Sequence, residues 1–435
     1  MRPPKELYYL LAATLAARLP WVFMVPMWEA PDENTHFWVI KFMAENLRLP
    51  GPAELTSGGQ QSVYVPLPHF GYVPHILAMW TLSGILDPSM APRFGSLLLS
   101  PLMTYFAWWL GRELFPDKKL CALAVPLLVV FHPQLVLVHS YSNNDITSST
   151  IASALLCLSV VIIKRGLSMP LSLLFGFLCG WLALTKYTGY AVLPAVALAY
   201  LLAAWIHRQG FVELLKNAIT ALALTVTIAA PWFARNYQLY DGDFMGTQTM
   251  RRNWAQLYNR PIEYYVSPFK ILVDRKWWRM MYFSYWGMFG YMTRPLIKPL
   301  YWTYTVYLAA AAISLVTAVF KNKAQTIADL RQKIQNPERK TVTHQAIWLV
   351  MLVCLLANLA AMILASTGNV GGPQGRYLFT SEVPFLALIV LGLSLTGDLW
   401  GKRLLYSLLA FNLIVYIWSW AMLFPIYGFR WKSFG

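Results

Sequence analysis

Apolar runs of about 20 residues recur along the whole chain, and they limit its fold more than any other feature. A helix rises about 1.5 Å per residue, so a run of about 20 residues crosses a hydrocarbon layer roughly 30 Å thick. Hydrophobic residues make up 57% of the 435 residues and charged residues only 12%. A soluble core cannot bury that much apolar surface. The sequence therefore predicts an all-α polytopic membrane protein.

Eleven apolar runs are long enough to be expected as transmembrane helices. No small-residue cleavage site follows the first run, so we expect it to remain as an anchor helix and not to be removed as a signal peptide. We expect residues 1–435 to form a single membrane domain with no separate soluble domain. The expected spans are 7–26, 93–110, 120–138, 146–164, 169–184, 186–206, 214–230, 299–319, 345–365, 378–396 and 401–423.

A further apolar run at 69–86 is better explained as a helix in the membrane interface, because it carries His69, Pro74 and His75. Without it as a span, lysine and arginine gather on one side of the membrane, as the positive-inside rule requires. We therefore expect juxtamembrane helices within a first external loop at 27–92. The basic residues on the inner side are Arg2, Lys5, Arg112, Lys118, Lys119, Lys164, Arg165, Arg208, Lys216, those of the linker 321–340, Lys402 and Arg403.

The formal net charge of +16 does not indicate a nucleic-acid partner. The basic residues are spread between apolar runs and form no basic domain, so we interpret them as topology markers and contacts to anionic membrane lipids. The four cysteines, Cys121, Cys157, Cys179 and Cys354, lie inside apolar runs without metal-ligand spacing. They are expected to be small buried side chains.

Carboxylates gather just beyond the outer ends of two expected spans. The stretch MWEAPDENTHFWVI carries Asp32, Glu33 and His36, and Asp145 begins a later span at the same level. Burial at the rim of a helix bundle is expected to raise the pKa of such a carboxylate and make it a better base. Helix capping by Pro31, Asp32 and Glu33 explains the same residues about equally well. A metal site of Asp32 and His36 is a weaker alternative, since two ligands at helical spacing recur by chance.

A long external loop at 231–298 carries many more basic than acidic residues, together with clustered aromatic residues. A lipid phosphate is a natural ligand for such a loop, because arginine binds phosphate oxygens bidentately. Basic side chains that snorkel beside interfacial aromatics are the alternative. Arg235 after APWF, and Arg376 in the GNVGGPQGRY turn, are the stronger individual candidates. Lys186, between two apolar runs, is costly at membrane depth unless it is paired or lies near the interface.

Five motifs in this order resemble those of the GT-C superfamily of membrane glycosyltransferases: APDENTHF, SNND, GFLCGWLALTKYTGYAVLP, APWFARNYQLYDGD and GPQGRYLF. The likeness runs from about residue 20 to 395 and is greatest to family-39-like enzymes and bacterial predicted membrane proteins with a PDE-x-x-H motif. One departure is YDGD at 240–243, where the pattern has YGD.

The resemblance implies transfer of a hexose or pentose from a polyprenyl-phosphate donor to a hydroxyl acceptor, with inversion. The acceptor would be an envelope glycan, a lipid or a protein. The protein would be a multi-pass component of the bacterial inner (plasma) membrane, with its site facing the periplasm or exterior. A divalent cation is optional as cofactor, because protein cations can hold the leaving phosphate. The implied catalytic residues are Asp32, Glu33 and Asp145, and the implied substrate-binding residues are His36, Lys186, Arg235, Arg376 and Tyr377.

Two other functions compete with a transferase. A transporter or flippase of a lipid-linked saccharide would also place ionisable residues in a helix bundle, but usually near the bilayer midplane and often with internal repeats. Here the acids lie at the outer ends of spans and the sequence contains no internal repeat. A non-catalytic assembly factor for envelope polysaccharide is the third possibility, if Asp32 only caps a helix.

Overall fold

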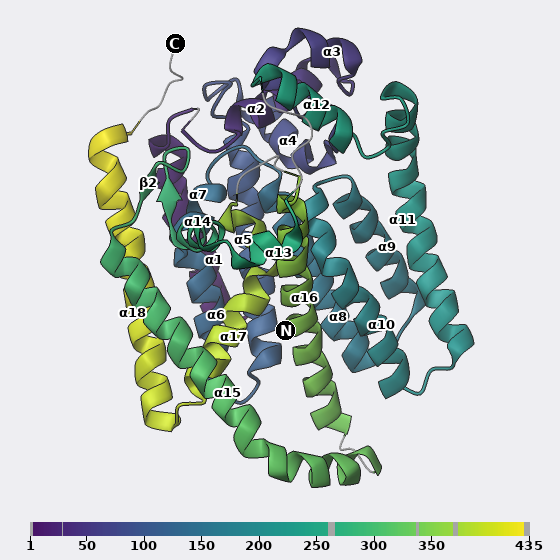
Figure 1. The fold of residues 1–435 in the computed structure, drawn as a ribbon, viewed down its shortest axis with the longest axis vertical. Helices are drawn as coiled ribbons and strands as arrows, with labels where there is room; N and C mark the ends of the chain where they lie inside the picture. The colour runs from purple at the N-terminus through teal and green to yellow at the C-terminus, as the bar shows by residue number, and fades with distance from the viewer. Residues whose placement is uncertain (1–2, 28, 260–265, 336–338, 369–372, 430–435) are drawn as a thin grey trace.

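The computed structural model describes residues 3–27, 29–259, 266–335, 339–368 and 373–429. Arg2, Arg260 and the centre of the 368–377 turn lie outside the described residues, as does part of the 321–340 linker. The described segments form a tall helical bundle, which we orient as in Figure 1, with an upper and a lower end.

Helices of 20 residues or more run between the two ends of the bundle (Figure 1). The α15 helix continues well past residue 319, where the expected span ends. The long helices are α1 (Lys5–Met24), α5 (Arg93–Leu114), α8 (Asp145–Arg165), α11 (Phe211–Leu239), α15 (Lys298–Gln335), α16 (Arg339–Ser366) and α18 (Asp398–Tyr427).

Three expected spans are interrupted near their upper ends. His132 has an extended backbone because it precedes Pro133, so the chain breaks there. Lys186 and Gln374 are also extended, and a 3₁₀ turn follows each. The interrupted spans are α6 (Lys119–Phe131) with α7 (Pro133–Val138), η3 (Tyr187–Val192) with α10 (Leu193–Ile206), and η4 (Gly375–Ser381) with α17 (Glu382–Ser394).

By length and composition, eight helical stretches of the described chain could cross a membrane. The other expected spans coincide with α5, with α6 and α7, and with α9 (Met169–Ala183). Of these, α6 and α9 are apolar but shorter than 18 residues. The predicted class, an all-α polytopic membrane protein, is confirmed.

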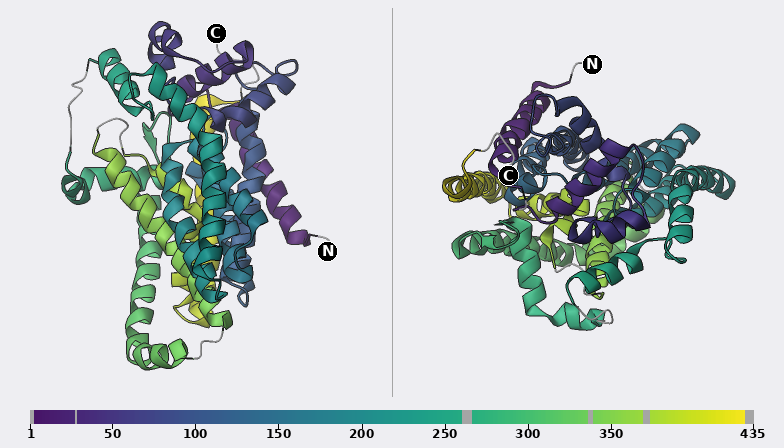
Figure 2. Two further views of the ribbon diagram at one scale, coloured as in Figure 1. Left: turned by 90° about the vertical axis from the view of Figure 1, so that its right-hand side faces the viewer. Right: turned by 90° about the horizontal axis from the view of Figure 1, so that it is seen from above.

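Short helices and one small β-ladder cover the upper end and its flank (Figures 1 and 2). The α4 helix has 10 residues and reaches only about 15 Å, so it is too short to span a membrane. It packs against α2 and α5, which is the juxtamembrane placement predicted for 69–86. The short elements are α2 (Glu33–Asn46), α3 (Pro52–Ser57), η1 (Gly59–Ser62), η2 (Phe70–Tyr72), α4 (Val73–Leu82), α12 (Thr247–Leu257), α13 (Pro268–Val273), α14 (Arg275–Trp286), β1 (Met288–Phe289) and β2 (Arg294–Pro295).

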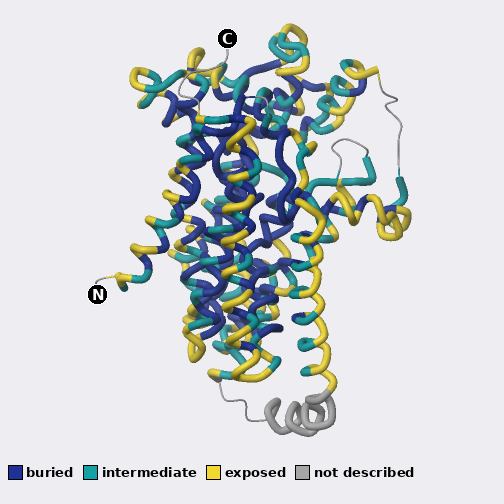
Figure 3. The backbone as a smooth tube through the Cα atoms, turned by 90° about the vertical axis from the view of Figure 1, so that its left-hand side faces the viewer, coloured by how far each residue is buried: buried dark blue, intermediate teal, exposed yellow. Residues whose placement is uncertain are grey.

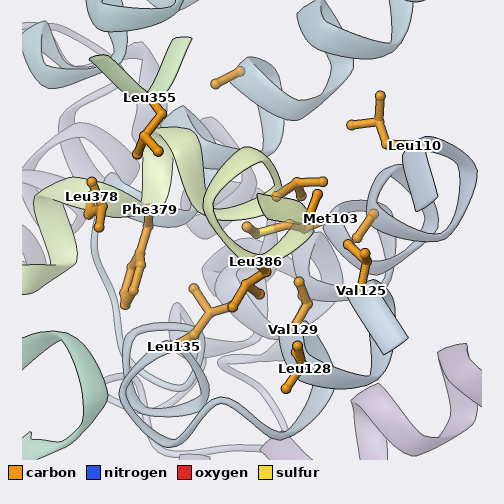
Figure 4. Close-up of a cluster of buried hydrophobic side chains, with 14 of the residues drawn as sticks. Met103, Leu110, Val125, Leu128, Val129, Leu135, Leu355, Leu378, Phe379 and Leu386 are labelled. Atoms are coloured by element: carbon orange, nitrogen blue, oxygen red, sulfur yellow. The ribbon is translucent and has the colours of Figure 1, made fainter. Parts of the chain in front are cut away.

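The α8 helix lies at the centre of the bundle and α11 at its edge. In the most apolar window of α8, 83% of the residues are buried, against 6% for α11. Burial is concentrated along the axis of the bundle (Figure 3). The close-up in Figure 4 shows Met103 of α5, Val125 of α6 and Leu386 of α17 in the same core. Residues at the upper end of α8 are therefore placed near the axis of the molecule.

Glycines allow α9 to approach α11 closely. A Cβ added at Gly176 would lie 2.6 Å from the carbonyl oxygen of Ala221, and one at Gly180 would lie 2.8 Å from the Ile228 side chain. Small residues four apart are a common means of close helix contact in membranes. This packing accounts for both glycines of the GFLCGWLALTK motif.

Candidate active site

Asp32 lies at the junction of α1 and α2, in the N-cap position of α2, with a left-handed backbone (φ 64°). Its carbonyl oxygen accepts hydrogen bonds from the backbone of Thr35 and His36, so the main chain starts the helix. Its side chain makes no capping bond and instead pairs with the guanidinium of Arg376. Of the Asp32 side chain, 25% is exposed. Asp32 thus occupies a helix start, but its carboxylate is available for another role.

Asp145 is the first residue of α8, and only 5% of its side chain is exposed. Its Oδ1 lies 2.7 Å from Nζ of Lys186, and its Oδ2 lies 3.6 Å from Nη1 of Arg376. Asn143 does the capping here, because its Oδ1 accepts hydrogen bonds from the backbone N–H of Asp145 and Ile146. The SNND motif therefore caps α8 and leaves the Asp145 carboxylate for the two cations.

Arg376 lies between the two carboxylates. Its Nη1 also donates to the hydroxyl of Tyr141 at 2.9 Å and to the carbonyl of Pro31 at 3.2 Å. The ring of Tyr377 lies 5.7 Å from the charged centres of both Arg376 and Lys186. Residues from four separate parts of the chain thus converge on one polar cluster, which consists of Asp32, Asp145, Lys186, Arg376 and Tyr377.

Other elements fix the η4 turn that carries Arg376. The backbone N–H of Gly375 donates to the hydroxyl of Ser284 in α14 at 2.8 Å. The Nδ2 of Asn358 in α16 donates to the carbonyls of Tyr377 and Leu378 at 3.2 Å. These contacts hold Arg376 in place while its own side chain makes the bonds of the cluster.

Several buried polar atoms of this region make no hydrogen bond within the described structure. They are Nε2 of His36, Oδ1 of Asn144, Oδ2 of Asp145 and Nε of Arg376. Buried polar atoms without protein partners are uncommon and usually bind water, an ion or a ligand. This unused capacity marks the cluster as a place where a polar ligand can bind.

The pKa of Asp32 differs from the sequence-based expectation. Burial alone would raise it, but the charge of Arg376 lowers the pKa of Asp32 below the usual 3.8. The expectation of a raised pKa is therefore wrong for this arrangement, because the sequence did not reveal the arginine partner. While this ion pair is intact, Asp32 is ionised but a weak base.

His36 is neutral at physiological pH. Burial, followed by the positive charge of Lys186, lowers its pKa to about 3. Its Nδ1 lies 2.6 Å from the hydroxyl of Tyr72, and its ring lies 5.2 Å from that of Tyr64. A neutral imidazole can form hydrogen bonds with a substrate but adds no positive charge for a phosphate.

Lys186 lies at the start of the expected span 186–206, where its Nζ pairs with the carboxylate of Asp145. Because 17% of the side chain remains exposed and a carboxylate lies beside it, the cost of placing this lysine at membrane depth is offset.

Glu33 lies next to Asp32 in the sequence but has a different environment. Its carboxylate is fully buried, and its two oxygens accept hydrogen bonds from Nε and Nη2 of Arg93 at 2.7 and 2.6 Å. Arg93 also donates to the carbonyls of Val22 and Val25 at the end of α1. Both oxygens of Glu33 are therefore occupied in an ion pair that ties α1, α2 and α5 together.

Arg235 has no described contact with the cluster. It lies on the peripheral helix α11, donates from Nη2 to the carbonyl of Pro50 at 2.6 Å, and lies 5.5 Å from the ring of Trp232. Its bond to Pro50 anchors the first loop, which explains the presence of Arg235 in the APWFARNYQLY motif. Sequence reasoning missed Arg93 and Tyr141, although Tyr141 belongs to the quoted HSYSNND loop.

No metal site is evident from the side chains. Within the part of the chain that the structure describes, no three His, Cys, Asp or Glu side chains are grouped so that they could hold a metal ion. Asp32 and Asp145 are instead neighbours of Arg376 and Lys186. The side chains of the cluster thus balance two negative charges with two positive ones.

No family model matches the sequence, and no curated protein matches it. Among solved structures, the chain is similar to ArnT from Cupriavidus metallidurans bound to undecaprenyl phosphate. That comparison has a TM-score of 0.51 and 14% sequence identity, and it covers 92% of this chain and 62% of ArnT. The chain is also similar, with a TM-score of 0.49 and 14% identity, to an oligosaccharyltransferase of Archaeoglobus fulgidus, over 99% of this chain and 54% of the other.

The fold and the polar cluster together define a class, a polytopic membrane protein with paired acids and bases at one end of its bundle. The chain shares its fold with ArnT. It spans less than two thirds of the length of ArnT.

Proposed function

We propose that this protein is a membrane glycosyltransferase that moves a sugar from a polyprenyl-phosphate donor to a hydroxyl acceptor. The observation that carries this proposal is the cluster in which Asp32 and Asp145 alternate with Arg376 and Lys186. Such a transfer needs a base near the acceptor hydroxyl and positive charge at the departing phosphate. The GT-C fold, shared with a protein whose structure contains undecaprenyl phosphate, supports the same donor class.

In the proposed mechanism, Arg376 changes its partner when the donor binds. The lipid phosphate draws the guanidinium away from Asp32, since a phosphate dianion or diester competes well for an arginine. Asp32 then loses the charge that lowers its pKa and becomes a stronger base. The ion pair therefore keeps the base inactive until a donor is present.

The transfer is a single displacement, which inverts the anomeric centre. The acceptor oxygen forms a bond to the anomeric carbon while Asp32 takes the hydroxyl proton. The bond from that carbon to the phosphate oxygen breaks, and its electron pair remains on the phosphate. Arg376 and Lys186 stabilise the charge that develops there. Asp145 holds both cations in position.

The remaining candidates receive different roles. The unpartnered Nε2 of His36 is proposed to form a hydrogen bond with the sugar or the acceptor. The Tyr377 ring, beside both cations, is proposed to line the donor site. Glu33 is proposed to be structural, because its oxygens are held by Arg93. Arg235 is proposed to position the first loop and not to bind phosphate.

The upper end is proposed to face the periplasm or exterior of a bacterial plasma membrane. The basic segments of the inner side, such as Lys164 with Arg165 and Lys402 with Arg403, lie at the lower ends of their helices. The positive-inside rule places those ends in the cytoplasm.

The proposal is tested by incubating the protein in lipid nanodiscs with a panel of radiolabelled polyprenyl-phosphate sugars. We expect release or transfer of sugar from one of these carriers, lowered at least about 10²-fold by Asp32→Asn. Asp274→Asn is the matched control, because Asp274 is an exposed aspartate whose side chain does cap its helix. Asparagine preserves capping, so this variant is expected to keep full activity.

Two results would overturn the proposal. If carriers bind and are moved across a bilayer without loss of the sugar, the protein is a transporter or flippase. If no carrier of the panel binds or reacts, and the protein instead restores polysaccharide assembly in cells equally well with Asp32→Asn, it is a non-catalytic assembly factor.

A further inference from the structure

A hollow of about 770 Å³ lies at the lower end of the bundle, the end opposite to Asp32. It is bounded by the start of α1, the end of α5 and the start of α6. Figure 2 shows the N-terminal part of α1 diverging from the other helices on this side. The hollow shares no residue with the proposed active site.

Part of the lining of the hollow is apolar and aromatic. It includes Leu7 of α1, Trp108 and Trp109 of α5, and Leu123 of α6. Leu7 and Trp108 are buried in the protein, so this lining is a fixed part of the bundle. Such a surface suits an acyl chain, because the chain can pack against these side chains and gain van der Waals contacts that an empty recess would lose.

Cations lie at the rim of the same hollow. Arg112 and Lys119 are both exposed, and neither forms an ion pair within the described residues. The guanidinium of Arg112 lies 4.9 Å from the ring centre of Trp108, which holds it next to the apolar lining. Lys164 also lines the hollow, but its Nζ lies 2.7 Å from a carboxylate oxygen of Glu113. Two cations that have no acidic partner among the described residues thus border an apolar recess at the lower end of the bundle.

We propose that this hollow binds one anionic phospholipid of the leaflet at the lower end. Its phosphate would contact Arg112 and Lys119, and an acyl chain would lie along Leu7 and Leu123. Basic pockets between transmembrane helices on the cytoplasmic side are suited to anionic headgroups. A soluble anion would use the rim only, whereas the apolar recess beside it requires a hydrocarbon chain. This site does not depend on the proposed transferase activity.

Native mass spectrometry of the purified protein tests the proposal, with phosphatidylglycerol or phosphatidylcholine added in detergent. We expect one phosphatidylglycerol to be retained per protein in preference to phosphatidylcholine. The double variant Arg112→Gln with Lys119→Gln should weaken this retention about tenfold or more. Leu123→Trp, which fills the recess and leaves the charges intact, should weaken it as well.

The matched control is Lys402→Gln with Arg403→Gln. These residues lie at the start of α18, at the same end of the bundle, and Arg403 also lies over a tryptophan, Trp400, at 5.3 Å. Trp400 is 61% exposed and does not line the hollow, so this variant should retain the lipid as the wild type does. Equal loss in both double variants would overturn the proposal, as would equal retention of phosphatidylcholine. A second copy of the chain crosslinked through the hollow would overturn it too.

Discussion

At the scale of single residues, Asp32 combines two roles that usually exclude each other. Its main chain begins α2, and its carboxylate points to Arg376 although an N-cap carboxylate normally binds its own helix. A left-handed aspartate costs roughly 1 kcal/mol or more. The ion pair with Arg376 is therefore the feature on which the proposed chemistry depends.

The change of partner proposed for Arg376 predicts two different pH limits. Before a donor binds, the charge of Arg376 outweighs burial and holds the pKa of Asp32 below 3.8. The acid limb of kcat/KM, which reports the protein without substrate, should therefore lie below about pH 4. The acid limb of kcat reports the donor complex and should lie at higher pH, since Arg376 is then bound to phosphate. Identical limbs in the two profiles would show that Arg376 does not leave Asp32.

The Glu33 pair with Arg93 predicts a loss of stability. Glu33→Gln leaves the buried Arg93 without its counter-ion, and we expect a loss of about 3–5 kcal/mol in the free energy of unfolding. Thermal unfolding in detergent measures it. Lys41→Gln is the control, because the exposed Lys41 and Glu45 pair is worth at most about 1 kcal/mol. A stable Glu33→Gln variant without activity would instead make Glu33 catalytic.

The sequence indicated which residues belong to the cluster, but not which acid pairs with which base. Acids at the ends of apolar runs, and a lysine and an arginine in short turns, stand out because charges are costly near a membrane. Which acid pairs with which base depends on the helix arrangement, so the opposite environments of Asp32 and Glu33 could not be read from two adjacent letters.

At the scale of elements, the η4 turn positions the arginine. Gly375 is tightly packed there, since an added Cβ would overlap the backbone of Tyr285 in α14. The same α14 residue donates from its hydroxyl to Glu382 at the start of α17 at 2.8 Å. Contacts with α14 thus fix the turn at its start, at Gly375, and just after its end, at Glu382.

Gly375→Ala should therefore displace Arg376 without removing any functional group. We expect kcat/KM to fall about tenfold or more while the protein stays folded, because small misplacements of a catalytic group are costly. Gly84→Ala is the control: an added Cβ at Gly84 would meet no atom within 4 Å. Unchanged activity in Gly375→Ala would show that η4 tolerates movement.

Element boundaries were predictable only where the apolar pattern ends. The runs at 186–206 and 378–396 read as continuous spans, yet each begins with a 3₁₀ turn that presents Lys186 or Arg376 to the cluster. Hydropathy does not distinguish a 3₁₀ turn from an α-helix. Only Pro133 gave a local signal for such a break.

At the scale of the whole molecule, the charge distribution predicts the orientation. Single cysteines introduced at Ser57 in α3 and at Lys402 in α18 lie at opposite ends of the bundle, and both positions are exposed. In intact cells, a membrane-impermeant maleimide should label Ser57→Cys, and should label Lys402→Cys only after permeabilisation. The reverse pattern would place the site in the cytoplasm.

The overall class was predictable at this scale because hydropathy and charge asymmetry act over whole helices. The packing order of the helices was not predictable. Arg235 was expected to bind substrate, whereas the structure places it on α11 at the edge of the bundle. The central position of α8, which places Asp145 beside Arg376 and Lys186, comes from interhelical packing that has no local sequence signal.

The role of Asp32 as the base is tested most directly by comparing donor binding with turnover in Asp32→Asn. Without the carboxylate, Arg376 is free for the phosphate, so polyprenyl phosphate should bind as tightly as in the wild type or more tightly. Turnover should nevertheless fall at least about 10²-fold, because no base remains. Unchanged turnover would contradict the account. Loss of binding together with turnover, in a protein that is still folded, would contradict it as well and make Asp32 a ligand-organising group.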